Sequence, residues 1–359
     1  MPDNKKKGTD SGLTYEKAGV DIAHTDSIKR GIAAYVEPSN PRVLNGLGPF
    51  ASLYDFRFDD IENPVLVLKS EEPGSKQKLA VQHGYTESVC HDMINHLIND
   101  IAVMGARPLA VLDTIVCGEA DGDTITTLVR GISEACRENE CDLVGGETSI
   151  QPGVLDKEVF ILTASVAGVA DREKIIDGSG IAPGDKILAI ASNGLHTNGY
   201  TLVRALMDDL PQILLERPGG ETFIEAIMKP HTPYYKALKG LFGNRAVHGM
   251  AHITGGGIEG NLSRIIPDGV SARIDLSRIE VPPVFSCIRL HGRVSDGEML
   301  KTFNCGAGLI IVADAGSEAV VTDAVSEYYR CYTIGEIIRA ITPGQPPVVF
   351  ENRLRWAGE

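Results

Sequence analysis

Residues 90–108 constrain the fold of this chain more than any other stretch, because their polar and apolar side chains separate onto opposite faces of a helix. At about 100° per residue, one face carries only polar groups: Asp92, Asn95, His96, Asn99 and Asp100. The other face is apolar and carries Met93, Ile94, Leu97, Ile98 and Ile101. No lysine or arginine lies between Lys78 and Arg107, so the carboxylates have no partner at helical spacing. Such a face suits a hard cation such as Mg²⁺, and an acidic surface stripe is an equally good interpretation.

The composition is that of a globular protein with room for two domains. The chain has 359 residues, of which 43% are hydrophobic and 23% charged. Its formal net charge of −14 argues against nucleic acid or anionic membranes as partners, so a phosphorylated ligand would need glycine loops or a bound cation. The seven cysteines form no CxxC pair, which predicts reduced thiols in a cytoplasmic protein. The polar N-terminus and the absence of an apolar run of about 18 residues predict neither signal peptide nor membrane span.

Hydrophobic periodicity predicts two domains of mixed α/β (α+β) class. In the first half it favours strands at 64–69, 109–117, 141–144 and 158–170, and helices at 26–36, within 90–108 and at 121–139. In the second half it favours strands at 186–191, 247–253, 309–313 and 333–338, and helices at 201–207, 232–242, 258–265, 297–303 and 317–329. The Gly- and Asp-rich stretch 171–185 is typical of a connection between domains. We therefore expect a disordered tail at 1–13, domains at 14–171 and 172–345, and a C-terminal tail at 346–359.

Three loops of the first half combine glycines with groups that bind phosphate or metal. The NGLG turn brings backbone N–H groups close to a ligand through Gly46 and Gly48, although such a turn alone is more often only a turn. The strand at 64–69 runs into a carboxylate, a hydroxyl and a lysine before a helix, a favourable place for metal and phosphate: Glu71, Ser75 and Lys76. The strand at 141–144 ends in a glycine pair that places a third unpaired carboxylate on a loop: Gly145, Gly146, Glu147 and Thr148.

Two loops of the second half carry histidine or glycine at strand ends. His196 lies between two Asn-Gly pairs in the loop 192–200, where a histidine is more often functional than on an apolar face. The strand at 247–253 leads into small residues that precede a helix: His252, Thr254, Gly255, Gly256 and Gly257. The unsatisfied N–H groups of that helix make the run a candidate phosphate cradle, with simple glycine flexibility as the alternative.

In their order and spacing, the motifs of this chain resemble one enzyme family. Between about residues 14 and 340 the chain carries AGVDI, NGLG, MGARPL, LVGGET, IIDGS, SNGLHTNGYTLVR, AHITGGG, NCGAG and IGEI. Together they resemble phosphoribosylformylglycinamidine cyclo-ligase, also called aminoimidazole ribonucleotide synthetase, of purine biosynthesis. The resemblance implies a homodimer whose N-terminal sheets pair into a shared barrel. An α/β C-terminal domain would complete each cleft for ATP and substrate.

The resemblance also implies a reaction and a set of site residues. ATP would close the imidazole ring of formylglycinamidine ribonucleotide through an iminophosphate, releasing ADP and phosphate. Four carboxylates would bind Mg²⁺: Glu71, Asp92, Asp100 and Glu147. The nucleotide would also contact Gly46, Gly48, Ser75, Lys76, Asn99, Gly145, Gly146 and Thr148. The substrate would contact His196, Thr197, Asn198, His252, Thr254, Gly255, Gly256 and Gly257. The catalytic groups would be His196, Asn198 and Lys76.

Two departures from the family pattern concern the nucleotide region. Where the family carries Asp-Gly-Val-Gly-Thr-Lys, this chain has Glu-Glu-Pro-Gly-Ser-Lys at 71–76, so the expected metal carboxylate is one methylene longer. A family lysine in the first motif is also displaced by one position, to Lys17. Two alternatives therefore stay open: a divergent paralogue that uses ATP to activate or phosphorylate another small molecule, and a dimeric nucleotide-binding protein without catalysis.

Overall fold

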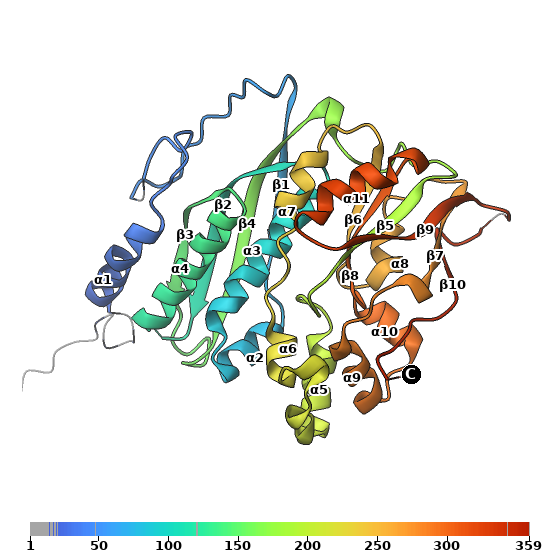
Figure 1. The fold of residues 1–359 in the computed structure, drawn as a ribbon. Coiled ribbons are helices and arrows are strands. Elements are labelled where there is room, and N and C mark those ends of the chain that lie inside the picture. The colour runs from blue at the N-terminus through green and yellow to red at the C-terminus, as the bar shows by residue number, and fades with distance from the viewer. Residues whose placement is uncertain are drawn as a thin grey trace, which may run out of the picture.

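The computed structural model describes residues 14, 17, 19, 21–46, 48–119, 121–342 and 344–358, apart from the side chain of Thr25. The tail expected at 1–13 lies outside this part of the chain. Figure 1 shows two sheets that each carry helices, one in the first half of the chain and one in the second. Among the described residues, no helix is both long and apolar enough to cross a membrane.

The first sheet contains β1 (Pro64–Glu71), β2 (Arg107–Cys117), β3 (Asp142–Ile150) and β4 (Phe160–Asp171), in the order β1-β4-β2-β3. β4 runs antiparallel to β1 and β2, while β2 and β3 are parallel. Buried and accessible residues alternate along β2 and β4, as expected for strands that helices cover on one face only. The strands predicted in this half are therefore confirmed, although β3 is longer than expected.

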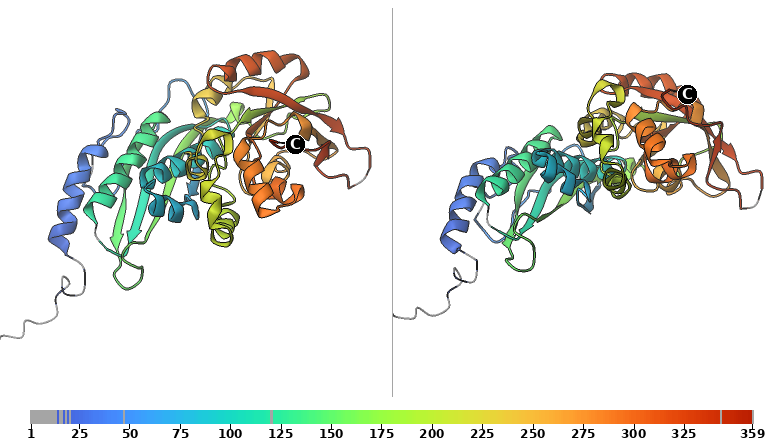
Figure 2. Two further views of the ribbon diagram at one scale, coloured as in Figure 1. Left: turned by 60° about the horizontal axis from the view of Figure 1, so that its bottom comes forward. Right: turned by 90° about the horizontal axis from the view of Figure 1, so that it is seen from below.

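Helices cover one face of this sheet. α3 (Thr86–Ala102) fully buries its predicted apolar face in the core that it shares with α4 (Gly122–Glu138). The carboxylate of Asp121 caps α4 by accepting a hydrogen bond from the N–H of Asp123. α2 (Lys76–His83) precedes α3, and α1 (Ile22–Ile32) lies along α4 at the outer edge of the molecule (Figure 2). The helix expected at 26–36 was placed too late, because Asp21 caps it at Ile22.

The second sheet has six strands in the order β10-β7-β9-β5-β8-β6. They are β5 (Lys186–Ala191), β6 (Val247–His252), β7 (Val270–Asp275), β8 (Ala307–Ala313), β9 (Cys331–Arg339) and β10 (Val348–Glu351). β8 is buried along its whole length. One face of the sheet packs into the same hydrophobic core as α3, and the other face forms a second core with helices of the C-terminal half. The two halves therefore share one continuous core.

The remaining elements are short. The helices are α5 (Tyr200–Asp209), α6 (Phe223–Met228), α7 (Tyr235–Leu238), α8 (Gly257–Leu262), α9 (Pro283–Gly292), α10 (Asp296–Thr302) and α11 (Glu318–Ser326). Single turns of 3-10 helix lie at Ala33–Tyr35, Arg172–Lys174, Pro211–Leu215, Pro218–Gly220, Lys239–Leu241, Leu276–Arg278 and Ala315–Ser317. The expected helix at 232–242 is only α7 followed by such a turn. Sequence periodicity missed α6, α9 and β7.

The C-terminal tail expected at 346–359 is part of the second sheet. β10 lies within it and pairs in parallel with β7. Beyond β10, Trp356 is only 4% exposed, and the guanidinium of Arg289 lies 4.9 Å from the centre of its ring. The expected end of the domain at 345 is therefore wrong, because a four-residue edge strand is too short for its periodicity to stand out.

β3 continues through the Gly-Gly-Glu-Thr motif, which was expected to be a loop. Gly146 is exposed but pairs directly with Asp113 of β2, and a Cβ built on it would lie 1.8 Å from Oδ1 of that carboxylate. A Cβ on Gly145 would instead meet Oγ of Ser52 at 3.1 Å, a much milder overlap. Packing therefore requires glycine at position 146 and not at position 145.

This difference predicts unequal effects of adding one methyl group. Gly146→Ala should lower the free energy of unfolding by about 1–3 kcal/mol, because the buried Asp113 has to move. Gly145→Ala is the matched control and should cost much less. Urea unfolding followed by circular dichroism measures both changes. Equal stabilities of the two variants would refute the packing role of Gly146.

Candidate functional site

The polar face of α3 does not point to solvent. It holds the segment between α6 and α7, which belongs to the second half of the chain (Figure 1). Nδ2 of Asn95 donates to the carbonyl of His231 at 2.7 Å, and Nδ2 of Asn99 donates to the carbonyl of Thr232 at 2.9 Å. The N–H of Tyr234 donates back to Oδ1 of Asn99 at 2.9 Å. The interpretation as an acidic surface stripe is therefore wrong.

Lys76 and Asp92 form an ion pair in the interior. Both side chains are 0% exposed, and Nζ lies 2.8 Å from Oδ1. Nζ also donates to the carbonyls of His196 at 3.2 Å and Lys229 at 2.7 Å, while Oδ1 of Asp92 accepts the N–H of His231 at 2.8 Å. Burial lowers the pKa of Lys76 and raises the pKa of Asp92, and their contact opposes both shifts.

This pair bears on two predictions. Lys76 was expected to bind phosphate, and the three hydrogens of its ammonium group are here matched by three oxygen acceptors. Asp92 was expected to bind Mg²⁺, and its Oδ1 here accepts from Lys76 and the N–H of His231, while its buried Oδ2 has no hydrogen-bond partner among the described residues. Sequence alone could not show this, because the two residues lie 16 positions apart and on different helices.

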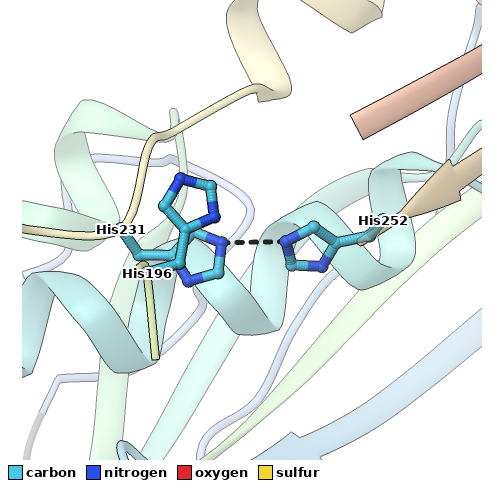
Figure 3. Close-up of side chains that lie close together, drawn as sticks. All are labelled: His196, His231 and His252. Atoms are coloured by element: carbon cyan, nitrogen blue, oxygen red, sulfur yellow. Dashed lines mark hydrogen bonds between the residues drawn. The ribbon is translucent and has the colours of Figure 1, made fainter. Parts of the chain in front are cut away.

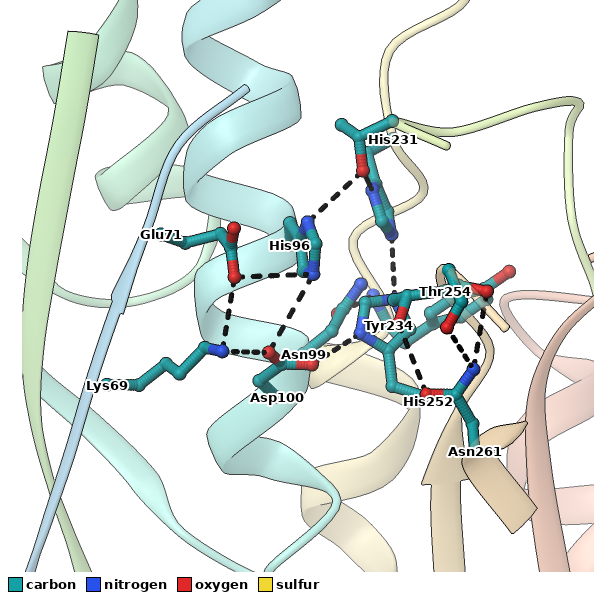
Figure 4. A network of polar contacts seen from close by, with 12 residues as sticks. Lys69, Glu71, His96, Asn99, Asp100, His231, Tyr234, His252, Thr254 and Asn261 are labelled. Atoms are coloured by element: carbon teal, nitrogen blue, oxygen red, sulfur yellow. Dashed lines mark hydrogen bonds and ion pairs between the residues drawn. The ribbon is translucent and has the colours of Figure 1, made fainter. Parts of the chain in front are cut away.

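A second charged cluster lies beside the first, at the end of β1. Nζ of Lys69 lies 3.1 Å from Oε2 of Glu71 and 3.1 Å from Oδ2 of Asp100 (Figure 4). Nε2 of His96 lies 3.7 Å from each of the same two oxygens. The predicted metal ligands Glu71 and Asp100 thus converge, and the cation between them is a lysine of the same strand as Glu71.

Four buried histidines continue this cluster into the interface between the halves. Nδ1 of His252 lies 2.7 Å from Oδ1 of Asp100, and its Nε2 lies 2.8 Å from Nε2 of His231. Oγ1 of Thr197 lies 3.1 Å from Nδ1 of His96 and 3.5 Å from Nδ1 of His231. Burial lowers the pKa of His96 to about 4 and holds the pKa values of His196 and His231 well below their usual range. These three rings are therefore neutral at pH 7.

His196 was expected to be a functional residue of the polar loop 192–200. The structure buries it, with its ring stacked on that of His231 at 4.0 Å between ring centres. Its φ of +60° lies in the left-handed region, which a residue other than glycine rarely adopts. Its Nε2 lies 3.1 Å from Oγ1 of Thr232, and its Nδ1 is buried without a hydrogen-bond partner. A strained backbone and an unpartnered polar atom are both typical of functional sites.

The glycine run after β6 adopts a conformation that glycine alone permits without strain. Gly256 and Gly257 have φ values of +96° and +61°, and a Cβ on Gly257 would lie 1.8 Å from the carbonyl oxygen of Leu300. Nδ2 of Asn261 fixes the turn by donating to the carbonyls of Gly255 at 3.2 Å and Gly257 at 2.8 Å. Packing thus explains Gly257, while Gly255 and Gly256 are exposed at the surface.

Three of the predicted loops meet beside this turn. A Cβ on Gly255 would lie 3.3 Å from Oδ1 of Asn198, and a Cβ on Gly74 would lie 3.7 Å from the carbonyl oxygen of Thr197. Ser75, which precedes α2, follows Gly74 directly. Nδ2 of Asn198 is buried and has no hydrogen-bond partner among the described residues. The loops predicted to hold substrate are therefore neighbours in space.

The other predicted nucleotide residues lie elsewhere in the subunit. One row of paired residues across the first sheet contains Glu71, Asp113 and Gly146. Three strand spacings, about 14 Å in all, separate Glu71 from Gly146 in this row. Glu147 follows Gly146 and therefore points to the opposite face from Glu71. Thr148 lies on the same edge strand, and the turn of Gly46 and Gly48 is joined to β3 through the hydrogen bond from Ser52 to the carbonyl of Val144. The four predicted carboxylates therefore do not form one metal site within a subunit.

Several site residues were not predicted: Lys69, Asn95, His96, His231, Thr232 and Asn261. Asn95 and His96 were visible on the polar face of the central helix, but no role was assigned to them. His231 follows a Lys-Pro pair in what seemed a helix start, and Lys69 ends an apolar strand. Neither position has a local motif, so only the fold brings these residues to the site.

Comparison with known proteins identifies the family. Residues 65–170 match the N-terminal domain of the AIR synthase related proteins, and residues 182–341 match their C-terminal domain. The phosphoribosylformylglycinamidine cyclo-ligase of Methylobacillus flagellatus is 39% identical over 345 residues, which cover 94% of this chain and 98% of that protein. The protein of the same name from Paraburkholderia xenovorans is 38% identical over 355 residues, which cover 97% of this chain and 99% of that protein.

Solved structures of lower identity share the fold. Hydrogenase maturation protein HypE in complex with ATP matches with a TM-score of 0.64 at 16% identity, over 94% of this chain and 96% of that one. Thiamine-monophosphate kinase from Stenotrophomonas maltophilia matches with a TM-score of 0.64 at 18% identity, over 94% and 98%. By both domains and by identity over nearly its whole length, the chain belongs to the phosphoribosylformylglycinamidine cyclo-ligase family of AIR synthase related proteins.

Proposed function

We propose that this chain is an ATP-dependent ligase that converts formylglycinamidine ribonucleotide into aminoimidazole ribonucleotide, ADP and phosphate. The observation that carries this proposal is the similarity to cyclo-ligases at 37–39% identity over 94–97% of the chain. A paralogue with another substrate, or a protein without catalysis, has less support, because these relatives at 37–39% identity carry the cyclo-ligase name, whereas the differently named structures are only 16–18% identical. The seven cysteines are all free thiols, which supports a place in the cytoplasm.

The proposed reaction has two steps. The amide oxygen of the substrate attacks the terminal phosphorus of ATP, the bond to ADP breaks, and an iminophosphate forms. A neighbouring amidine nitrogen then attacks the activated carbon and loses a proton, and phosphate leaves as the ring closes. Positioning and charge neutralisation contribute more to such phosphoryl transfer than covalent catalysis by the protein.

The junction of the three loops supplies the groups for the substrate. The unpartnered amide of Asn198 is a donor that a substrate oxygen would satisfy, and the exposed N–H groups of Gly255 and Gly256 beside it suit a phosphate. Thr254 and Asn261 hold this loop in place. Nε2 of His196 is engaged with Thr232, and its unpartnered Nδ1 is the ring atom available to take up the proton that the attacking nitrogen loses.

The cluster at the end of β1 suits the phosphates of ATP. Glu71 and Asp100 would hold Mg²⁺, which neutralises phosphate charge when it is bound. The fit is supported by Lys69, whose ammonium group already draws the two carboxylates to one point. With the ion held by Glu71 and Asp100, Lys69 would supply a further positive charge for the phosphates. Lys76 and Asp92 act here as positioning residues, since they anchor the loop that carries His196.

The protein should act as a homodimer. The face of the first sheet that α3 and α4 leave open exposes large apolar side chains on three neighbouring strands: Leu66, Leu68, Leu112 and Ile161. A contiguous apolar face on a sheet marks a protein interface. Pairing this face with its copy agrees with the shared barrel that the sequence motifs imply.

The function is tested by product analysis. Purified protein with formylglycinamidine ribonucleotide, ATP and Mg²⁺ should release one ADP for each aminoimidazole ribonucleotide formed. ADP without that product would indicate a paralogue, and nucleotide binding without turnover would indicate a non-catalytic protein. Either result would overturn the proposal.

The metal site is tested by removing one charge. Glu71→Gln keeps the shape of the side chain, and it should weaken ATP binding in the presence of Mg²⁺ by on the order of 10-fold or more. Glu72→Gln is the matched control, because Glu72 is exposed and should change affinity little. Isothermal titration calorimetry measures both. Equal affinities would show that this loop does not contact the metal.

The role of His196 is tested with a residue that tolerates its backbone. His196→Asn should keep the left-handed conformation, because asparagine adopts positive φ more readily than most residues. The substitution should lower kcat by about 10²-fold or more, as expected on loss of a proton acceptor. Steady-state kinetics and a thermal melt of the same sample separate catalysis from folding. An unchanged kcat would show that the ring is structural.

The dimer is tested by placing a charge on the open face. Leu68→Glu should yield a monomer, because Leu68 is 69% exposed on the part of that face that β1 contributes. Leu290→Glu is the control, since Leu290 is 70% exposed on α9, in the other half of the chain. Light scattering at micromolar concentration gives both masses. A dimeric Leu68→Glu variant would exclude this face as the interface.

A further inference from the structure

Three histidines from separate segments bring their ring nitrogens together in the interface between the two halves. They are His196 from the loop after β5, His231 from the segment before α7, and His252 at the end of β6 (Figure 3). One ring nitrogen of each lies within 4.8 Å of those of the other two, and all three side chains are buried. We propose that these histidines form a binding site for a transition-metal ion of the zinc class.

The hydrogen bonding of His252 prepares its Nε2 for a metal. A carboxylate only accepts hydrogen bonds, so Nδ1, which lies 2.7 Å from Oδ1 of Asp100, carries the proton. In the neutral ring Nε2 then holds a lone pair, and it points at His231 (Figure 4). A carboxylate that orients a histidine through its other nitrogen is the usual outer contact of a metal-binding histidine.

His231 can release its Nε2 without losing a hydrogen bond overall. Its Nε2 lies 2.8 Å from Nε2 of His252 and donates a hydrogen bond to the lone pair there. Its Nδ1 lies 3.5 Å from Oγ1 of Thr197, which can accept a proton there. A change of tautomer moves the proton to Nδ1 and leaves a second lone pair at Nε2. A metal ion would thus replace a shared proton.

His196 supplies an independent observation. Its Nε2 is held by the hydroxyl of Thr232 at 3.1 Å, while its Nδ1 is fully buried and has no hydrogen-bond partner among the described residues. An unpaired polar atom in the interior is costly, and a bound ion would remove that cost. Because burial keeps the pKa values of His196 and His231 low, neither ring has to lose a proton before it binds a metal at neutral pH.

The donors select the class of ion. Three neutral imidazoles suit Zn²⁺, Co²⁺, Ni²⁺ or Cu²⁺, whereas Mg²⁺ prefers oxygen ligands such as Glu71 and Asp100. Nitrogens bound to zinc at about 2.0–2.1 Å in a tetrahedron lie about 3.3 Å apart, so the pair His231–His252, now 2.8 Å apart, would open slightly. The site is distinct from that proposed for the nucleotide, although Asp100 serves both.

The proposal links metal binding to the proposed activity. An ion on Nδ1 of His196 takes the lone pair that accepts the substrate proton in the proposed reaction. The metal-bound and active forms are then two exclusive states, and zinc-class ions should inhibit turnover. This consequence rests on the proposed function, but binding itself can be measured without activity.

The test uses full-length protein treated with a chelator and then dialysed. Co²⁺ is titrated while the visible d–d absorption of the ion is recorded, and Zn²⁺ affinity is measured by calorimetry. Wild-type protein should bind one Co²⁺ with the intense absorption of a four-coordinate, nitrogen-rich site, and Zn²⁺ should raise its melting temperature. Absence of both effects would overturn the proposal, whatever the enzymatic assay shows.

Three variants locate the ion. His231→Asn should lower Zn²⁺ affinity by on the order of 10-fold or more, and Asp100→Asn should lower it by about 10–100-fold through loss of the outer contact. His83→Asn, on the exposed side of α2, is the matched control and should have no effect. Circular dichroism of each metal-free variant shows whether it is folded. If His231→Asn does not fold, Asp100→Asn still tests the site, because it keeps all three ligands.

A fourth variant distinguishes the neighbouring arrangement of His96, Asp100 and His252, whose ligand atoms also lie within 4.8 Å of one another. His96→Asn should leave Zn²⁺ affinity within about 2-fold of wild type, because His96 is not a ligand in the proposed site. If His96→Asn abolishes binding while His231→Asn does not, the ion lies at that other cluster and the proposal is wrong.

Discussion

The buried ion pair of Lys76 and Asp92 holds the two halves of this protein together. An ammonium group without solvent requires an acceptor for each of its hydrogens, and here one acceptor comes from α3, one from the loop after β5 and one from the end of α6. The pair therefore fixes the backbone of His196 relative to α3. The asparagines of the same helix face then hold the segment of His231 and Thr232. The candidate site follows from this one set of contacts.

The sequence predicted what local patterns encode. The amphipathic period of α3 identified its buried apolar face, and the alternation of the strands identified most of both sheets. The ordered motifs identified the family, which the comparisons confirm. The motifs also predicted that Glu71 and Asp100 act together and that the loops of Asn198 and Gly255 belong to one site. In the structure, each of these pairs lies close together.

Long-range contacts account for what the sequence left open. No basic residue lies near Asp92 or Asp100 along α3, as the sequence shows, but both carboxylates have partners from other segments. These are Lys76 from the start of α2 and Lys69 from β1. Glu147 seemed to be a loop residue because glycine pairs often end strands, whereas β3 continues through the pair to pack against Asp113. The burial of His196 could not be read from its flanking glycines, since these serve the left-handed turn that carries the ring inward.

We infer that Lys76 and Asp92 assemble the site and do not bind the ligand. A double-mutant cycle of Lys76→Met and Asp92→Leu, measured by urea unfolding, separates these two roles. Each single substitution should lower the free energy of unfolding by about 3–5 kcal/mol, because it leaves a buried charge unpaired, and the double variant should regain a large part of that loss. A Lys76→Met variant with wild-type stability and weakened ATP binding would refute the inference, because the lysine would then be a phosphate ligand.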